Sequence, residues 1–432
     1  MPFSSRSSDT FFTDRPRRGN SLRNIAIVAG AILALGGVVT AYGLRRGDTG
    51  VEPSTGAAEQ IALAGKLVET NQADKAIVLL DQVAAGEKGG QLPEAATLLR
   101  LEALEDANMD ARLAAEANAF LERFPNSARK DEVELMALSG KVASAGLTEP
   151  GLLQTVESFI RKNPERPGVA KLQLALARQE IGVGDEPAAR RRLLMALKDP
   201  SLKGNDRKAA MDLLGAVNLS ALFRGDSQTG ADTTYTVASG DSIWLIAKRH
   251  EITQELVLRA NGIDDPRRLR VGQTLRIPNT DFSLHCDVAK NELVVYNHGE
   301  FFKRYHVRTG REAGATPTGE FKILNKKTEP TWRPGDGRVY LPGDPNNELG
   351  TRWMAFEGDI LGIHGTIHPE TVGHYASNGC IGLTTPEVEE LFELVLEGTP
   401  LTITGQQDLA ANKVIPAPQV PDPLTKREIA GL

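Results

Sequence analysis

A histidine and a cysteine in glycine-flanked segments are the residues of this chain best suited to covalent chemistry. His364 precedes Gly365, and Cys380 follows Gly379. A thiolate attacks carbonyl carbons well but must first lose its proton, and a neighbouring imidazole can take that proton and return it to a leaving amine. The glycines predict tight turns, which let backbone N–H groups approach a substrate and stabilise an oxyanion. We therefore predict that His364 and Cys380 form a base and nucleophile pair.

Four motifs around this pair follow one another in the order of a known family. They are Thr316-Pro317-Thr318-Gly319-Glu320-Phe321, Leu349-Gly350-Thr351-Arg352-Trp353, Ile363-His364-Gly365-Thr366 and Ser377-Asn378-Gly379-Cys380-Ile381. Together they resemble the YkuD-type L,D-transpeptidases over residues 281–404. The resemblance implies a mainly-β YkuD-type sandwich that cleaves the L-centre-to-D-Ala bond of a peptidoglycan tetrapeptide stem. Such an enzyme holds the stem as a thioester and passes it to an amine, without a cofactor or a metal.

The resemblance also assigns roles to single residues. It implies that Cys380 is the nucleophile, that His364 is the base and that the Gly365 carbonyl orients the imidazole. Support for the oxyanion region is expected from Ser377, Asn378 and Gly379. Candidate contacts to the stem are Thr366, Trp353, Arg352 and Tyr340. Core packing is the alternative for Trp353, and a surface ion pair is the alternative for Arg352.

Two positions depart from the family pattern. The family usually reads Ser-His-Gly-Cys-Ile/Val-Arg/Asn, whereas this chain has Asn378 and Gly382 in place of the second histidine and the final Arg/Asn. Asn378 forms hydrogen bonds but cannot become cationic, so it does not lower the thiol pKa electrostatically. These departures leave three interpretations open: an enzyme of lower activity, an enzyme with a different acceptor, or a degenerate, non-catalytic domain.

The remaining chemical groups near the pair have simpler interpretations. His368 and His374 could join Cys380 in a zinc site, but two scattered histidines and one cysteine form a weak pattern without a fourth ligand. Cys286 lies in an alternating segment typical of a half-buried strand, which favours a core residue over a disulfide to Cys380.

A second recognisable unit precedes the first. Residues 234–278 begin with Tyr235-Thr236-Val237 and end with Leu269-Arg270-Val271-Gly272-Gln273-Thr274-Leu275-Arg276-Ile277-Pro278, and they resemble a LysM module. Two short strands and a capped helix predict the order βααβ. The resemblance implies binding to the glycan strands of peptidoglycan. The candidate glycan contacts are Gly240, Asp241, Ser242, Ile243, Asn261, Gly262 and Ile263, although helix capping or packing explains several of them equally well.

The N-terminus predicts a location. Residues 25–44 are apolar and about 20 residues long, which suffices to span a hydrocarbon core of about 30 Å. Arginines dominate the arm at 1–24, so the positive-inside rule keeps this end in the cytoplasm. A cleaved signal peptide is the alternative, but the apolar stretch is longer than a usual signal core. We predict a single-pass anchor in the bacterial cytoplasmic membrane, with the catalytic domain in the periplasm or cell-wall space.

Composition divides the rest of the multidomain chain. Residues 45–56 read as a linker and residues 57–224 as an all-α region. The segment 119–125 recurs approximately at 158–164, which favours a TPR-like array that offers a face to a protein partner, with an irregular bundle as the alternative. Residues 405–432 form a Pro-rich tail. The net charge of −6 and the lack of a basic stripe exclude nucleic acid as a plausible partner.

These features together predict a membrane-anchored, wall-binding L,D-transpeptidase with the LysM module holding it near its polymeric substrate. Two alternatives remain open. One is a non-catalytic peptidoglycan-binding scaffold, and the other is an L,D-carboxypeptidase, or a transferase that uses a protein lysine.

Overall fold

The computed structural model describes residues 55–87, 89–225, 232–335, 337–358 and 360–408. The predicted arm at 1–24 and membrane span at 25–44 lie outside these residues, as do most of the linker and most of the tail. Within the described ranges, no helix is both long enough and apolar enough to cross a bilayer. The chain divides into two compact units between Val156 and Glu157.

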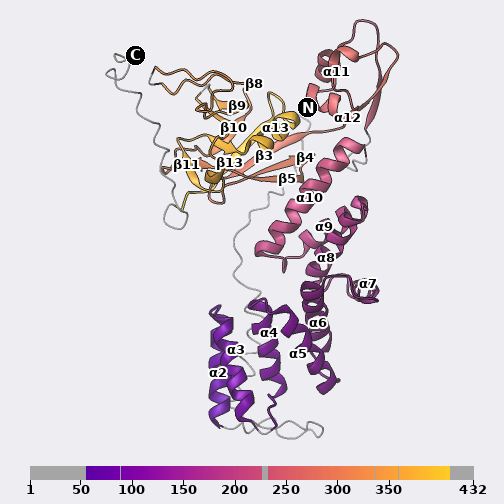
Figure 1. The fold of residues 1–432 in the computed structure, drawn as a ribbon, viewed down its shortest axis with the longest axis vertical. Helices are drawn as coiled ribbons and strands as arrows, with labels where there is room; N and C mark the ends of the chain where they lie inside the picture. Colours follow the sequence, from indigo (N-terminus) through magenta and orange to yellow (C-terminus); the bar gives the residue numbers. More distant parts are fainter. Residues whose placement is uncertain (1–54, 88, 226–231, 336, 359, 409–432) are drawn as a thin grey trace, which may run out of the picture. The chain divides into compact units, whose positions relative to one another are not determined.

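The first unit is helical. Its helices are α2 (Thr55–Glu69), α3 (Ala73–Gly86), α4 (Glu94–Asp106), α5 (Asp110–Arg123) and α6 (Lys130–Ala145), and α7 (Leu152–Lys162) crosses the boundary to the second unit (Figure 1). Alanine and leucine side chains such as Leu80 and Leu104 are fully buried between these helices. Helix α2 begins at Thr55, inside the predicted 45–56 linker, because Ala57 already packs into this core and fixes the first turn.

Each copy of the recurring segment contains the end of a helix. Helix α5 ends just before Phe124-Pro125, and helix α7 ends just before Asn163-Pro164. The amides of Phe124 and Asn163 each close the last helical turn on Phe120 and Phe159, four residues earlier. One further helix separates the two copies, so the offset corresponds to a helix pair.

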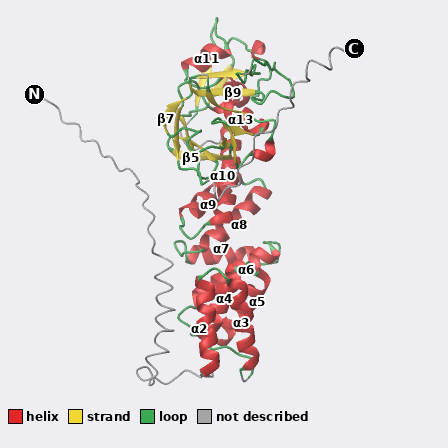
Figure 2. Ribbon diagram, turned by 90° about the vertical axis from the view of Figure 1, so that its left-hand side faces the viewer, coloured by secondary structure: helices red, strands yellow, loops and turns green. Residues whose placement is uncertain are grey.

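The second unit begins with helices and continues into strands (Figure 2). Helices α8 (Val169–Gly182), α9 (Glu186–Lys198) and α10 (Gly204–Arg224) pack through Leu174, Leu193 and Leu214. Asp185 begins α9 as an N-cap whose carboxylate accepts the Ala188 amide at 3.1 Å.

The next element is a small βααβ module, in the order that the sequence predicts. Strand β1 (Thr233–Thr236) pairs antiparallel with β2 (Thr274–Ile277), and α11 (Ile243–Arg249) and α12 (Gln254–Ala260) lie between them in the chain. The hydroxyls of Ser242 and Thr253 cap the two helices. A short 3-10 turn, η1 (Pro266–Arg268), precedes β2.

The C-terminal part is mainly β. Its elements are β3 (Phe282–Asp287), β4 (Glu292–Asn297), β5 (Glu300–His306), β6 (Thr309–Gly310), β7 (Gly319–Lys322), β8 (Asn325–Thr328), β9 (Arg352–Glu357), β10 (Leu361–Gly365), η2 (Pro369–Thr371), β11 (Tyr375–Ser377), β12 (Ile381–Leu383), α13 (Thr385–Leu394) and β13 (Pro400–Thr404). A five-stranded sheet has the order β5-β4-β3-β13-β7, and a four-stranded sheet has the order β12-β10-β9-β8. The short pair β11-β6 completes the described strands of this part.

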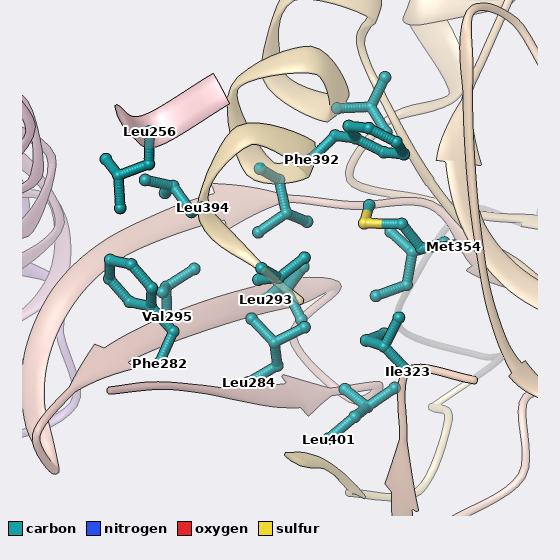
Figure 3. Close-up of a cluster of buried hydrophobic side chains, with 14 of the residues drawn as sticks. Leu256, Phe282, Leu284, Leu293, Val295, Ile323, Met354, Phe392, Leu394 and Leu401 are labelled. Carbon is teal, nitrogen blue, oxygen red and sulfur yellow. The ribbon is translucent and has the colours of Figure 1, made fainter. Parts of the chain in front are cut away.

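One apolar core joins these sheets to α13 and to the small module. Figure 3 shows Leu284 and Leu293 of the five-stranded sheet in the same cluster as Met354 of β9 and Leu394 of α13. Leu256 of α12 belongs to this cluster as well. Polar contacts strengthen the join, because the guanidinium of Arg259 lies 2.7 Å from the Glu393 carboxylate at the end of α13. The βααβ module is therefore packed against the mainly-β part of the chain, with a shared core.

Helix α10 covers the outer edge of the five-stranded sheet (Figure 1). The Asn218 side-chain amide donates to the Phe302 carbonyl of the edge strand β5 at 2.9 Å. The Arg304 guanidinium of the same strand lies 2.7 Å from Asp212 and 2.6 Å from Glu292. An uncovered edge strand presents unpaired backbone groups to other chains, so α10 protects the sheet from such pairing.

Candidate active site

Two short, buried strands position the predicted base and nucleophile. Strands β10 and β12 run parallel, with Ile363 opposite Ile381 and His364 opposite Gly382. Cys380 immediately precedes β12, so it lies diagonally across from His364. Diagonal neighbours on adjacent strands have Cα atoms about 7–8 Å apart, which long and aromatic side chains can bridge.

His364 is held in a defined orientation. Its Nδ1 lies 2.5 Å from the Gly365 carbonyl oxygen, and its ring stacks on Trp353 of β9 with centroids 5.9 Å apart. A carbonyl only accepts hydrogen bonds, so Nδ1 carries the proton and Nε2 carries the lone pair. The side chain is 3% exposed. Burial, with a smaller contribution from the Arg308 guanidinium, lowers the pKa of His364 to about 3, so the ring is neutral at neutral pH.

The Cys380 thiol sits at the rim of the same sheet. The residue is half-buried, and its Sγ lies 3.9 Å from the Ile360 carbonyl oxygen. Burial raises the pKa of the thiol, whereas the Gly362 N–H and the Arg308 guanidinium act in the opposite direction. With the imidazole pKa far below the thiol pKa, the resting pair is a neutral thiol and a neutral imidazole.

The loop before Cys380 is fixed by its own hydrogen bonds. Ser377 Oγ donates to the Cys380 carbonyl at 2.6 Å and accepts the Gly379 amide at 3.1 Å. The Gly379 N–H, a predicted donor to the oxyanion, is thus already bonded to Ser377 within the loop. The Asn378 side chain is exposed to solvent. Gly379 has φ of 129°, and a Cβ there would lie 2.5 Å from the Ala315 carbonyl oxygen. Only glycine fits this position without a shift of backbone.

Thr316 is a positioning residue whose role the sequence motif did not reveal. It is 2% exposed, and its Oγ1 accepts the Gly310 amide at 2.8 Å and donates to the Gly379 carbonyl at 2.9 Å. The Gly379 carbonyl belongs to the peptide bond that leads into Cys380. The threonine of the Thr-Pro-Thr-Gly motif thus ties the cysteine loop to β6.

Arg308 is the second residue that sequence reasoning missed. It lies between β5 and β6, is 3% exposed, and forms two backbone hydrogen bonds with Gly382, of 2.8 and 2.9 Å. A single arginine after a strand that already contains charged residues gives no signal of a site in the sequence. Its partner strand is more than 70 residues away along the chain.

The residues predicted to contact the substrate have different environments. Trp353 is buried beneath His364, which fits the packing alternative. Thr366 is 3% exposed, and its Oγ1 accepts the His368 amide at 3.0 Å. Tyr340 lies in the loop before β9 and stacks on Trp332, with centroids 5.1 Å apart.

Arg352 points away from the pair. Neighbouring residues of a strand face opposite sides of the sheet, so Arg352 and Trp353 cannot both face His364. The Arg352 guanidinium instead lies 3.6 Å from Glu389 of α13 and over the Phe392 ring. The structure therefore favours the surface ion pair over recognition of a substrate carboxylate.

The remaining histidines and the second cysteine stand apart from the pair. His368 Nδ1 lies 3.4 Å from Glu370, and His374 lies in the turn before β11. Across the described part of the chain, no cluster of three or more His, Cys, Asp or Glu side chains could hold a metal ion. Cys286 is fully buried in β3, as its alternating segment predicts, and both cysteines are free thiols. Burial raises the pKa of Cys286 to about 12, so this thiol is unreactive.

Comparison with known proteins agrees with this geometry. A family model for the L,D-transpeptidase catalytic domain, YkuD, matches residues 281–403, and a LysM domain model matches residues 235–278. The chain is similar to a Bacillus subtilis protein named L,D-transpeptidase YkuD, with 30% identity over 39% of this chain and 98% of that protein. The chain belongs to the YkuD family of L,D-transpeptidases.

One further relative and one solved structure also match. The protein named L,D-transpeptidase YqjB, also from Bacillus subtilis, is 40% identical over 26% of this chain, which spans 66% of that protein. The NMR structure of the catalytic domain from E. faecium L,D-transpeptidase is 26% identical, with a TM-score of 0.24 over 29% of this chain and 97% of that one.

In the LysM domain, several predicted glycan contacts are occupied by internal bonds. Asp241 accepts the Tyr235 hydroxyl at 2.6 Å and the Ala238 amide at 2.8 Å, and these bonds lower the pKa of its carboxyl. Ser242 caps α11, and Ile243 is 2% exposed. Gly240 stands in the preceding turn with φ of 89°. The capping and packing alternatives therefore describe these side chains.

The turn after α12 borders a surface depression of about 530 Å³. Its lining residues are Asn261, Gly262, Ile263, Asp264, Arg268, Arg270, Val271, Gly272 and Gln273. The Asn261 side chain is itself engaged with the backbone of Arg276, through bonds of 2.7 and 2.8 Å. Within the predicted set, Gly262, the half-buried Ile263 and backbone groups of this turn remain accessible to a ligand.

Proposed function

We propose that this protein is a membrane-anchored cell-wall L,D-transpeptidase in which Cys380 is the nucleophile and His364 the base. The observation that carries the proposal is the orientation of His364. With Nδ1 donating to the Gly365 carbonyl, Nε2 has a lone pair on the strand next to Cys380. This arrangement needs no acidic third residue, because the backbone carbonyl fixes the tautomer.

The proposed reaction has two steps, in which the stem is first transferred to Cys380 and then passed to an acceptor amine. Cys380 Sγ attacks the carbonyl that joins the L-centre of the third stem residue to D-Ala, and His364 Nε2 takes the thiol proton. Collapse of the tetrahedral intermediate breaks the C–N bond, and the imidazolium returns the proton to the leaving D-Ala amine. An acceptor amine then attacks the thioester and loses a proton to His364, which releases the thiol and forms a new amide.

Binding to the glycan strands is proposed for the LysM domain, through the depression after α12. Because this domain shares a core with α13, a bound glycan strand would hold the catalytic site at a fixed distance from its stems. The apolar stretch at 25–44 is proposed as the membrane anchor that keeps both domains outside the cytoplasm. We further propose a TPR-like role for the helical region as the surface for a protein partner.

The test is to incubate the full-length protein with purified disaccharide-tetrapeptide and identify the products by mass spectrometry. Cys380→Ala and Cys286→Ala serve as the matched pair, since only the first removes the proposed nucleophile. We expect a crosslinked dimer, free D-Ala and a transient protein adduct that Cys380→Ala abolishes and Cys286→Ala retains.

Each other product points to another function. A trimmed tripeptide without a dimer would identify a carboxypeptidase that uses water as acceptor. Unchanged substrate and no adduct, with a folded protein that still sediments with peptidoglycan, would refute the enzyme and favour a wall-binding scaffold.

A further inference from the structure

The absence of a side chain at Gly382 leaves a space beside the base. Gly382 is paired with His364 across β10 and β12. Side chains at paired positions of adjacent strands point to the same face of the sheet. Any side chain at 382 would therefore stand next to the imidazole, on the side of β12 that leads back to Cys380.

Arg308 fills this space from the segment between β5 and β6. A Cβ built on Gly382 would lie 2.5 Å from Arg308 Nε, 2.6 Å from its Cγ and 2.9 Å from its Cδ. The Arg308 backbone is held in register by both hydrogen bonds to Gly382. Trp353 from β9, His364 from β10 and Arg308, which lies over Gly382 of β12, are thus neighbours on this face.

The guanidinium is buried and incompletely paired. Its NH2 group lies 4.0 Å from the Glu348 carboxylate, and its Nε has no hydrogen-bond partner among the residues that the structure describes. A buried N–H of a cation without an acceptor is costly unless an anionic or carbonyl group reaches it at some stage of the cycle. The nearby group that becomes anionic during the proposed reaction is the Cys380 sulfur.

We propose that Arg308 is a positioning residue whose guanidinium, held over Gly382, stabilises the Cys380 thiolate and thereby compensates for the missing side chain at position 382. The proposal rests on Cys380 as the nucleophile of the proposed function. A cation here also keeps His364 neutral, because it opposes protonation of the neighbouring imidazole. The cation therefore favours the anionic sulfur and disfavours the imidazolium that forms when His364 takes the thiol proton.

Other charges act on the same two groups. Glu348 raises the pKa of the Cys380 thiol and opposes the lowering by Arg308. Arg311 and Glu370 act on the Arg308 guanidinium with opposite signs. The contribution of Arg308 to the pKa of the Cys380 thiol is therefore measured by changing Arg308 alone and keeping Glu348, Arg311 and Glu370.

The experiment measures the alkylation rate of Cys380 in the full-length protein as a function of pH. Iodoacetamide is the probe, and mass spectrometry of the Cys380 peptide separates it from the buried Cys286. Arg308→Gln removes the charge, and Arg308→Lys retains it. We expect Arg308→Gln to move the alkylation midpoint up by about one pH unit, and so to lower the rate below the midpoint about tenfold, with Arg308→Lys close to the parent.

An unchanged midpoint in folded Arg308→Gln would overturn the proposal. If that variant does not fold, as judged by thermal unfolding, the paired change Arg308→Ser with Gly382→Arg returns a guanidinium to the same place from β12. A parental midpoint in the pair supports the proposal, and a raised midpoint overturns it. Alkylation needs no peptidoglycan, so a chain that fails to process tetrapeptide but shows the shift would refute the proposed function alone.

Discussion

Replacing Thr316 by valine tests how far the cysteine loop depends on one hydroxyl. Valine has nearly the shape of threonine, so the change removes two hydrogen bonds without opening a cavity. The Gly310 amide and the Gly379 carbonyl would both lose their partner in a position where Thr316 is 2% exposed. An unsatisfied buried polar group costs roughly 1–3 kcal/mol, so we expect a loss of about 2–6 kcal/mol in the free energy of unfolding.

Urea unfolding followed by tryptophan fluorescence measures this loss in the relevant region. All three tryptophans, Trp244, Trp332 and Trp353, lie in the LysM and catalytic domains, so the helical region does not contribute to the signal. Thr316→Ser is the matched control, because it keeps the hydroxyl and loses one methyl group, at a cost of about 1 kcal/mol. Adduct formation by Cys380 should fall at least about tenfold in Thr316→Val, since the nucleophile is then less well positioned. A valine variant as stable as the serine variant would refute the reasoning.

Three further predictions concern other residues of the YkuD domain. Gly382→Ala should destabilise the protein by about 1–3 kcal/mol, because its Cβ meets the Arg308 side chain at 2.5 Å, and Arg308→Ala should relieve most of this cost in a double-mutant cycle; additive costs would contradict it. His364 has a pKa of about 3 in the folded state, below its usual value of about 6.5, so the unfolded state binds more protons between these values and stability falls as pH falls. We expect about 2 kcal/mol less stability at pH 5 than at pH 7, and a weaker pH dependence in His364→Gln; equal slopes in the two proteins would exclude this residue as the cause. Iodoacetamide at pH 8 should label Cys380 and leave Cys286 unmodified in the folded protein, because burial raises the pKa of Cys286 to about 12; peptide mapping that finds Cys286 labelled first would disprove the difference.

The sequence was most informative where periodicity is strong. The βααβ order of the LysM domain and the half-buried strand at Cys286 were predicted, because short strands, a capped helix and an alternating segment give clear local signals. The two strands that carry the site were not. Strands β10 and β12 are short, contain glycine and are buried on both faces, so they show neither alternation nor a hydrophilic face.

Residue types pointed to the proposed pair of His364 and Cys380, but contacts between distant segments determine the surroundings of these two residues. Arg352 illustrates a placement that local geometry could have indicated, since it neighbours Trp353 and must face the other side of β9. Arg308 illustrates a contact that no local rule supplies, because its place beside Gly382 depends on the pairing of two segments far apart in the chain.

Gly382 and Arg308 have to be interpreted together. Taken alone, glycine at 382 removes a side chain from the site, and arginine at 308 buries a charge at the end of a strand. The separation of 2.5 Å between the Gly382 Cβ position and Arg308 Nε means that a larger residue at 382 excludes this arginine conformation. The lack of a side chain at Gly382 therefore makes room for the Arg308 guanidinium beside His364. A chain with this fold and a large side chain after the cysteine would need a smaller residue, or another side-chain conformation, at the position of Arg308. The apparent loss at 382 is thus no argument against catalysis by Cys380 until Arg308 has been changed as well.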